Sequence, residues 1–279
     1  MTVKFFCPRW GAEDMDWELF LAKVKQAGYH GIEWTPYSRP DDHLEVVRLL
    51  EKYGLEFVIV MAVTGQEGQG FETYPDALEQ QLRDLASIRT DTLAPLHISV
   101  QMGREYYTSE QVSECLERCR RVSNDRGLPV YQETHRNKWS FAAHTVYPRL
   151  LEQKDFSLTL DVSHWFCVSE SYLEDQQPAV ELAIRRARHV HARVGHTEGP
   201  QVWDPAAPEY AQALQEHLRI WDKWVALMRE SGAACCTITP EFGPPPYLVF
   251  GNRPGTPFEE QWRINLWMKN FLRDRYKND

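Results

Sequence analysis

The stretch SLTLDVSHWF, residues 157–166, joins a short strand pattern to an acid. Residues 157–160 read as a strand that runs directly into Asp161, and His164 follows three residues later. A carboxylate at the end of an apolar strand is costly to desolvate unless something pairs with it. The stretch therefore predicts a strand whose carboxyl end carries a functional group.

Working outward from this stretch, strand patterns and helix patterns alternate along the whole chain. We expect strands at 3–7, 29–35, 56–63, 95–101, 128–135, 157–164, 188–195 and 235–243. We expect helices at 17–28, 41–54, 75–88, 109–127, 142–153, 178–187, 209–232 and 259–276, the fourth capped by Ser109 and ended by Gly127.

Repeated strand-then-helix units predict a parallel sheet, and eight of them in 279 residues fit a closed (β/α)8 TIM barrel. The alternative is a doubly wound open sheet, which usually has a glycine-rich phosphate turn after its first strand. Residues 7–14, CPRWGAED, are not such a turn. The sequence therefore predicts an α/β fold with a single TIM barrel domain over residues 1–279.

Composition narrows the class of partner. The net charge is −9, which argues against nucleic acid, because its binding proteins usually show a basic surface. No apolar run reaches the roughly 18 residues of a membrane span, and the first residues lack a signal-peptide layout. The six cysteines follow neither disulfide-framework nor zinc-finger spacing, so we expect reduced, buried thiols in a cytoplasmic protein.

Four consecutive expected strands each deliver one possible metal ligand at the carboxyl end. They are Glu133, Asp161, His191 and Glu241. In a TIM barrel this end carries the active site. Any one of these residues alone would fit a helix cap, a salt bridge or a core histidine. Four at equivalent positions favour one divalent ion, such as Mn²⁺, Mg²⁺, Co²⁺ or Zn²⁺.

The order E…DxSH…HxH…E on strands five to eight resembles the xylose isomerase-like TIM barrels, within the sugar phosphate isomerase/epimerase group. This group includes ketose 3-epimerases, inosose dehydratases and, more distantly, endonuclease IV-type DNA repair enzymes. The likeness extends from VKFFCPRWG near the start to TPEFGPP near the end. It implies that the four residues named above bind the metal, that Glu133 and Glu241 transfer protons as catalytic residues, and that His164 contacts substrate.

The chain departs from the ketose 3-epimerases at two positions. These enzymes carry an arginine six residues beyond the metal histidine and a glutamate six beyond the first ligand, where this chain has Thr197 and Trp139. Four nearby side chains are available to contact substrate instead. They are Arg193, His196, His135 and Arg136. We therefore expect substrate contacts that differ from those of the ketose 3-epimerases, which argues against a free ketohexose as the substrate.

Other residues at the same end of the barrel are candidates for the pocket wall. Trp10 and Trp165 offer indole faces for a sugar or pack loops over the barrel mouth. Glu33 and Gln101 end the second and fourth expected strands, and we expect them to line the pocket. The Pro- and Gly-rich loops 196–210 and 243–260 fit either a lid or a contact in a homo-oligomer.

The sequence thus predicts a metal-dependent isomerase or epimerase acting on a small carbohydrate or sugar-derived polyol. The alternative is a metal-dependent lyase that dehydrates a keto-sugar or inosose, since the same base would begin that reaction. An endonuclease IV-like enzyme is a weaker alternative, because the extra ligands of a three-metal site are missing after strands three, four and seven. A barrel that only binds its ligand would not need two glutamates beside a metal.

Overall fold

Eight parallel strands form a closed barrel at the centre of the protein, as the alternating pattern predicted. The structure is a computed structural model that describes residues 1–36, 42–62, 70–251 and 254–277. Each strand pairs with the next along the chain, and the eighth pairs with the first, so that Phe5 lies beside Ile238. The strands are β1 Thr2–Pro8, β2 Gly31–Trp34, β3 Glu56–Ala62, β4 Ile98–Gln101, β5 Val130–Glu133, β6 Ser157–Leu160, β7 Ala187–His191 and β8 Cys235–Thr239.

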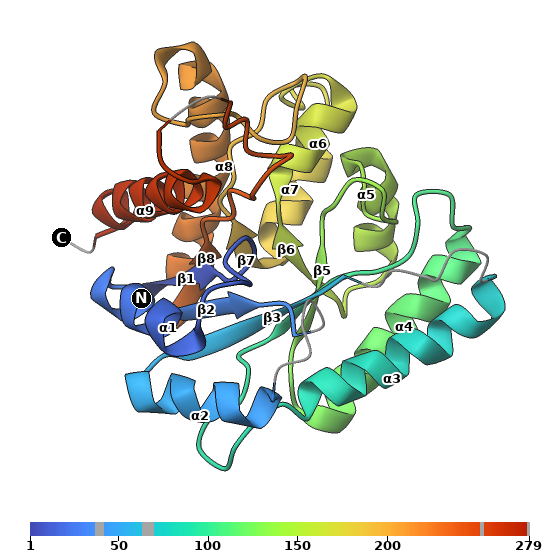
Figure 1. Ribbon diagram of the computed structural model, residues 1–279. Helices are drawn as coiled ribbons and strands as arrows, with labels where there is room; N and C mark the ends of the chain where they lie inside the picture. Colours follow the sequence, from blue (N-terminus) through green and yellow to red (C-terminus); the bar gives the residue numbers. More distant parts are fainter. Residues whose placement is uncertain (37–41, 63–69, 252–253, 278–279) are drawn as a thin grey trace.

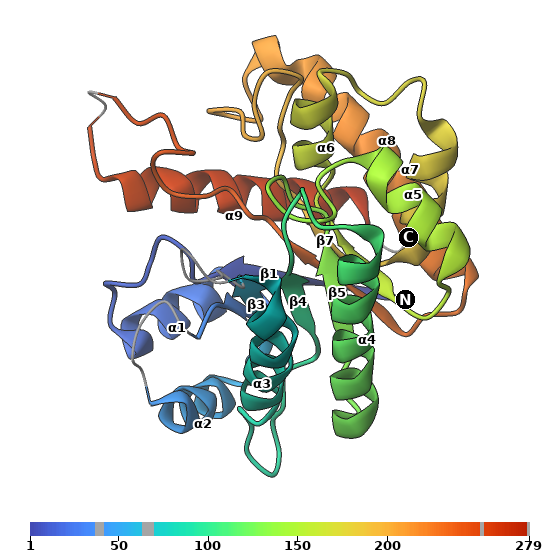
Figure 2. The ribbon, with the colours of Figure 1, turned by 90° about the vertical axis from the view of Figure 1, so that its right-hand side faces the viewer.

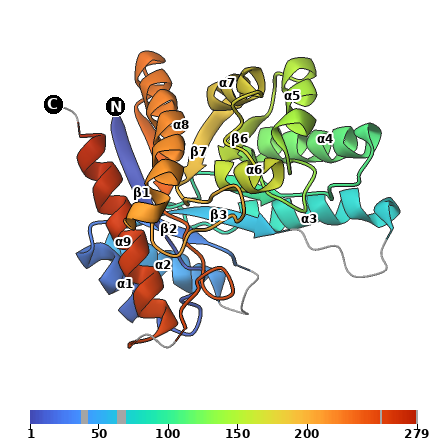
Figure 3. The same ribbon diagram turned by 90° about the horizontal axis from the view of Figure 1, so that it is seen from above.

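Helices surround this barrel (Figures 1 and 3), and α3 and α4 run side by side on its outside (Figures 1 and 2). The α-helices of the described residues are α1 Trp17–Gln26, α2 His43–Tyr53, α3 Tyr74–Ala86, α4 Ser109–Arg126, α5 Ala143–Glu152, α6 Val162–Ser169, α7 Gln177–Arg186, α8 Ala211–Glu230 and α9 Pro257–Arg275. Short 3₁₀ turns, η1 Phe71–Thr73 and η2 Pro208–Tyr210, precede α3 and α8.

The helix boundaries follow from local capping, with one correction. Helix α4 is capped by Thr108 and not by Ser109, because the Thr108 side chain accepts from the Gln111 backbone while the Gln111 side chain accepts from the Thr108 backbone. This reciprocal pair satisfies two N–H groups that a serine one position later would leave open. At the other end Gly127 adopts the left-handed conformation with φ 61°, as expected for a glycine that ends a helix.

Helix α6 was not predicted, since the sequence pattern indicated eight helices and a strand over 157–164. The strand stops at Leu160, and Asp161 caps a new helix by accepting from the Ser163 backbone at 3.0 Å. His164 therefore lies in the first turn of α6. The acid that the sequence singled out has a capping role as well as its place at the barrel rim.

Most expected strands were too long. Pairing in β5 ends at Glu133, in β7 at His191 and in β8 at Thr239, and the extended residues beyond these points belong to the rim loops. A barrel strand stays hydrogen-bonded only where its neighbouring strands lie beside it. The strand propensities of the residues do not predict where the neighbours diverge. Two predicted element ends, Asp41 and Val63, lie outside the described residues.

The main core packs the outer face of the barrel against the helices, with Phe57, Trp221 and Trp224 fully buried. All six cysteines are free thiols, but the expectation that all are buried was wrong: Cys235 is exposed and Cys167 is half-buried. No helix in the part of the chain that the structure describes is both long and apolar enough to cross a membrane.

Inside the barrel, polar residues replace part of the usual aliphatic filling. His189 Nδ1 lies 2.8 Å from Thr237 Oγ1, and Ser99 Oγ lies 2.6 Å from Thr159 Oγ1. The ring of His97 lies 4.7 Å from that of His189. Most buried polar groups in proteins have a hydrogen-bond partner, and these two pairs satisfy each other, whereas Nε2 of His97 has no such partner among the described residues. This network lies beneath the rim and supports the residues at the strand ends.

Candidate metal centre and active site

Four side chains from four successive strand ends meet at the barrel rim. Glu133 is the last residue of β5, Asp161 directly follows β6, His191 ends β7, and Glu241 lies two residues beyond β8. Each offers one ligand atom, and these atoms all lie within 4.8 Å of one another. All four side chains are buried, Glu241 being the most exposed at 6%. Three carboxylates and one imidazole so close together are a donor set for one divalent ion.

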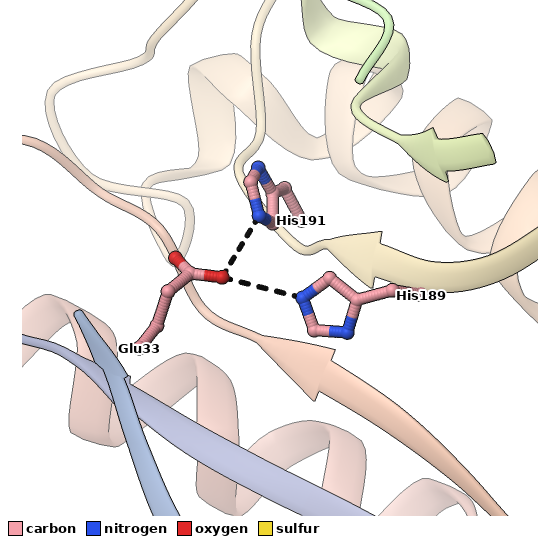
Figure 4. A group of neighbouring side chains, drawn as sticks. All are labelled: Glu33, His189 and His191. Atoms are coloured by element: carbon pink, nitrogen blue, oxygen red, sulfur yellow. Dashed lines mark hydrogen bonds and ion pairs between the residues drawn. The ribbon is translucent and has the colours of Figure 1, made fainter. Parts of the chain in front are cut away.

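Glu33 contacts both His191 and His189 through one oxygen of its carboxylate (Figure 4). Glu33 Oε2 lies 3.0 Å from His191 Nε2 and 3.3 Å from His189 Nε2, and it accepts from Thr239 Oγ1 at 3.0 Å. A carboxylate that accepts from one nitrogen of a histidine leaves the other nitrogen to face a metal.

That other nitrogen, His191 Nδ1, faces the acid cluster. It lies 3.2 Å from Glu241 Oε2 and 3.5 Å from Glu133 Oε1. Neither contact has hydrogen-bond geometry, so this buried nitrogen makes no hydrogen bond within the described part of the chain. A buried polar atom without a hydrogen bond calls for an explanation, and a bound ion supplies one.

The charges of the cluster shift its pKa values in opposite directions. Burial alone would lower the pKa of His191, but the carboxylates of Glu241, Glu33 and Glu133 hold it well above its usual value. Burial raises the pKa of Glu241 to about 7, against the lowering influence of His191. Burial also acts to raise the pKa of Glu133, yet the charge of His191 keeps it below its usual value. The site is thus a strongly coupled set of charges.

Two further side chains predicted for the pocket contact the cluster directly. Gln101 Nε2 lies 3.1 and 3.0 Å from the two oxygens of Glu133, which fixes that carboxylate in one orientation. Arg193 Nη2 lies 2.5 Å from Asp161 Oδ2 and 3.7 Å from Glu241 Oε2. With only 1% of its surface exposed, Arg193 places a positive charge at the edge of the cluster.

His164 lies between two arginines and beside a second histidine. Its Nε2 is 2.7 Å from Arg193 Nη2, and its Nδ1 is 3.3 Å from Arg136 Nη1. The ring of His135 lies 4.0 Å from that of His164. Burial and these positive neighbours hold the pKa of His164 well below its usual value. The structure thus brings His164, His135 and Arg193, three residues predicted to contact substrate, together beside the acids.

A cavity of about 350 Å³, here called the central cavity, opens onto this group. Its lining includes Trp10, Glu33, Gln101, His135, Arg193, Glu241 and Tyr247. Trp10 and Tyr247 meet edge to face with ring centroids 5.4 Å apart. The lining thus combines aromatic rings with charged side chains, a combination that suits a small polar ligand.

The structure does not bring every predicted aromatic residue to the cavity. Trp165 is 1% exposed in α6, its indole donates to the Ser140 carbonyl at 2.9 Å, and it does not line the central cavity. Tyr247, which the sequence did not single out, takes a place in the wall. Its position in the Pro-rich loop after β8 was the only indication available from the sequence.

Two other groups of side chains could hold a metal, but both overlap the first. Glu33, His189 and His191 share His191 with it, and Glu133, His135 and His164 share Glu133. His189 also uses Nδ1 toward Thr237, which leaves little ligand capacity. Because of these shared residues, the three groups are not independent of one another.

Comparison with known proteins finds similar folds among solved structures only. No protein-family model and no curated protein sequence matches the chain. Among solved structures, a probable 3-DHS dehydratase from Bacillus anthracis, AsbF, superposes with a TM-score of 0.62 and 15% identity, over 98% of this chain and 100% of its own. D-allulose 3-epimerase from Methylomonas sp., in complex with D-allulose, gives a TM-score of 0.63 and 12% identity over 99% and 98%.

A xylose isomerase-like TIM barrel protein from Mycobacterium smegmatis, in complex with magnesium, has a TM-score of 0.55 and 12% identity over 97% of this chain and 98% of that one. At such identities the likeness shows the fold alone. It confirms the predicted resemblance: the chain has the fold of the xylose isomerase-like TIM barrels.

Proposed function

We propose that the protein is a divalent-metal-dependent isomerase or epimerase that acts on a sugar or sugar-derived polyol. One observation carries this proposal: four ligand atoms, from Glu133, Asp161, His191 and Glu241, lie within 4.8 Å of one another at the carboxyl end of a TIM barrel. The buried Nδ1 of His191, which lacks a hydrogen bond and lies beside the carboxylates of Glu133 and Glu241, supports a cation there.

The ligand set fits an ion that prefers oxygen with some nitrogen, such as Mn²⁺, Mg²⁺, Co²⁺ or Zn²⁺. When bound, such an ion would stabilise the negative charge that develops when a C–H next to a carbonyl loses its proton. The neighbouring arginine and histidines bring nitrogen donors to the same place. Asp161 serves two roles in the proposal, as a ligand and as the cap of α6.

Proton transfer in the proposed reaction falls to Glu133 and Glu241, which come from strands on different parts of the rim. One takes a proton from a carbon of the substrate, and the other returns it to the same or the neighbouring carbon. Gln101 holds the Glu133 carboxylate through both of its oxygens, so the base has a defined direction. In the proposal, His164 and Arg193 contact substrate oxygens. Arg193 and Trp10 support this because both line the central cavity, where Trp10 would give the sugar an apolar wall.

A lyase acting on a keto-sugar or inosose is the second candidate. The same carboxylate would remove the first proton, and elimination then needs a group that protonates the departing hydroxyl. His164 and His135 lie together beside the acids and are the candidate proton donors, and Arg136 beside them could hold the departing oxygen by a hydrogen bond. One of the similar solved structures is described as a probable dehydratase.

Exchange of substrate hydrogen with solvent tests both candidates. We would incubate the Mn²⁺-loaded protein with a panel of ketoses and inososes in D₂O and follow deuterium incorporation by NMR and mass spectrometry. Deuterium at a carbon next to the carbonyl, with the formula unchanged, supports the isomerase. Loss of water supports the lyase. If no member of the panel exchanges, and the Glu133→Gln variant matches the parent, the proposed proton transfer is wrong.

A further inference from the structure

A second cavity adjoins the central cavity across Tyr247. It has a volume of about 350 Å³, and we call it the side cavity. Its lining includes Arg136, His196, Glu198, Gln201, Tyr247 and Val249. Tyr247 lines both cavities, so a ligand larger than a single group could contact both. None of the candidate metal ligands lines the side cavity, and this leaves its role open.

Arg136 and Arg193 lie against the same aromatic ring. The guanidinium carbon of Arg136 is 4.9 Å from the Tyr247 ring centroid, and that of Arg193 is 5.1 Å from it. Arg193 is neutralised by Asp161 at 2.5 Å. Arg136, half-buried, forms no ion pair with any residue that the structure describes. Both arginines thus contact the Tyr247 ring, but only Arg193 has a carboxylate partner among the described residues.

His164 does not satisfy both arginines. An imidazole ring has at most one nitrogen that accepts a hydrogen bond. The shorter contact, at 2.7 Å, is to Arg193, and Arg136 lies at 3.3 Å from the other nitrogen. If His164 accepts from Arg193, the guanidinium of Arg136 is held in place by stacking and has no acceptor from the side chains around it.

The surroundings of Arg136 favour an anion. Its near neighbours His164 and His135 bring nitrogen atoms rather than carboxylates, and the buried Asp161 is paired with Arg193. Glu198 is the carboxylate of the side-cavity lining, but it is exposed and makes no ion pair with Arg136. A partly desolvated guanidinium that lies over an aromatic ring suits a carboxylate or phosphate, which accepts two parallel N–H bonds.

We propose that Arg136 binds an anionic group of the substrate, a carboxylate or a phosphate, in the side cavity, while the sugar carbons lie in the central cavity. The substrate class is then an acidic sugar derivative rather than a neutral ketose. The sugar part of this inference rests on the proposed function, whereas the anion site rests on Arg136 and the side chains around it. It agrees with the loss, at Thr197 and Trp139, of two residues that the ketose 3-epimerases use.

Three probes with a related keto-sugar framework test the proposal by isothermal titration calorimetry. They are D-fructose, which is neutral, 2-keto-D-gluconate, which carries a carboxylate, and D-fructose 6-phosphate. We expect one or both anions to bind the full-length protein roughly 10- to 100-fold more tightly than D-fructose, the gain typical of charge-assisted hydrogen bonds. Which anion binds more tightly identifies the group.

Variants separate Arg136 from the general charge of the rim. Arg136→Gln should remove the preference, so that the anions bind no more tightly than D-fructose, and Arg136→Lys should retain part of it. Arg104→Gln is the matched control: it removes a charge from the loop after β4, where Arg104 contacts Asn137. Equal binding of all three probes, absence of binding, or an anion preference that survives Arg136→Gln would overturn the proposal.

Repeating the titrations after treatment with a chelator distinguishes the two proposals. Anion preference without a metal, combined with no exchange of substrate hydrogen in D₂O, would leave the anion site standing and reject the metal-dependent reaction. Exchange of hydrogen in neutral ketoses, with no preference for the anions, would leave the metal-dependent reaction standing and reject the anion site.

Discussion

Replacing Glu33 with glutamine should weaken divalent metal binding at the rim, although Glu33 is not among the four proposed ligands. Glu33 accepts from Thr239 and faces both His189 and His191 through one oxygen, Oε2. Its own pKa lies well below the usual value, because the positive charge of His191 and the hydrogen bonds outweigh the effect of burial. A neutral amide has one acceptor oxygen and no charge, so it cannot hold His191 as firmly.

Loss of a carboxylate that orients a metal-binding histidine typically costs 10- to 100-fold in affinity, or about 1.4 to 2.7 kcal/mol. We expect a loss in this range, measured as the dissociation constant for Zn²⁺ or Mn²⁺ in competition with a fluorescent chelator. Nitrogen-15 NMR of labelled histidine would report on the same change in the metal-free protein, as altered His191 Nε2 and Nδ1 shifts.

Glu13→Gln is the matched control, because Glu13 also lines the central cavity but bonds to the Gly11 backbone at 2.9 Å instead of to a histidine. Its metal affinity should stay within about twofold of the parent. If Glu33→Gln binds metal as tightly as the parent while remaining folded, or if both variants lose affinity equally, the orienting role of Glu33 is refuted.

Three further predictions concern stability and catalysis. Burial lowers the pKa of His217 to about 4, so as the pH falls the unfolded chain binds a proton on this histidine before the folded protein does. The free energy of unfolding should therefore decrease by roughly 3 kcal/mol between pH 6.5 and 4. Denaturant titrations of His217→Gln should show a smaller decrease. Gly127→Ala should lower stability by about 1 to 2 kcal/mol in the same assay, because φ is 61° and no atom within 4 Å offers new contact; an unchanged midpoint would contradict this. Gln101→Leu should lower kcat at least 10-fold with little change in melting temperature, since Glu133 loses the amide that orients it; equal kcat would remove Gln101 from the account.

The barrel and the positions of the rim acids could be predicted because both depend on order along the chain. Parallel strands place their carboxyl ends at one edge, so residues as far apart as Glu133 and Glu241 are brought together by topology alone. Helix α6 escaped prediction because its first residues continue the apolar pattern of β6, and only the Asp161 side chain decides where the strand stops.

Other features depend on side-chain direction, which no spacing rule reports. The bond between Glu33 and His191 joins residues 158 positions apart, and it depends on which face of each strand end turns inward. Trp165 occupies a position next to the proposed substrate-binding His164, yet the first turn of α6 directs its indole to the Ser140 carbonyl. The stacking of Arg136 on Tyr247 likewise required two loops to be placed in space.

The central claim is that one divalent ion binds at the four rim residues, and elemental analysis of the purified protein tests it most directly. We would measure the metal content after soaking in Mn²⁺ and removal of free ion, in the parent, Glu133→Gln, Asp161→Asn and a surface control, Glu181→Gln. The control alters an ion pair with Lys223 on the outside of the barrel. The account predicts about one ion per chain in the parent and control and far less in the two rim variants. No bound ion in the parent, or the same content in all four proteins, would contradict it.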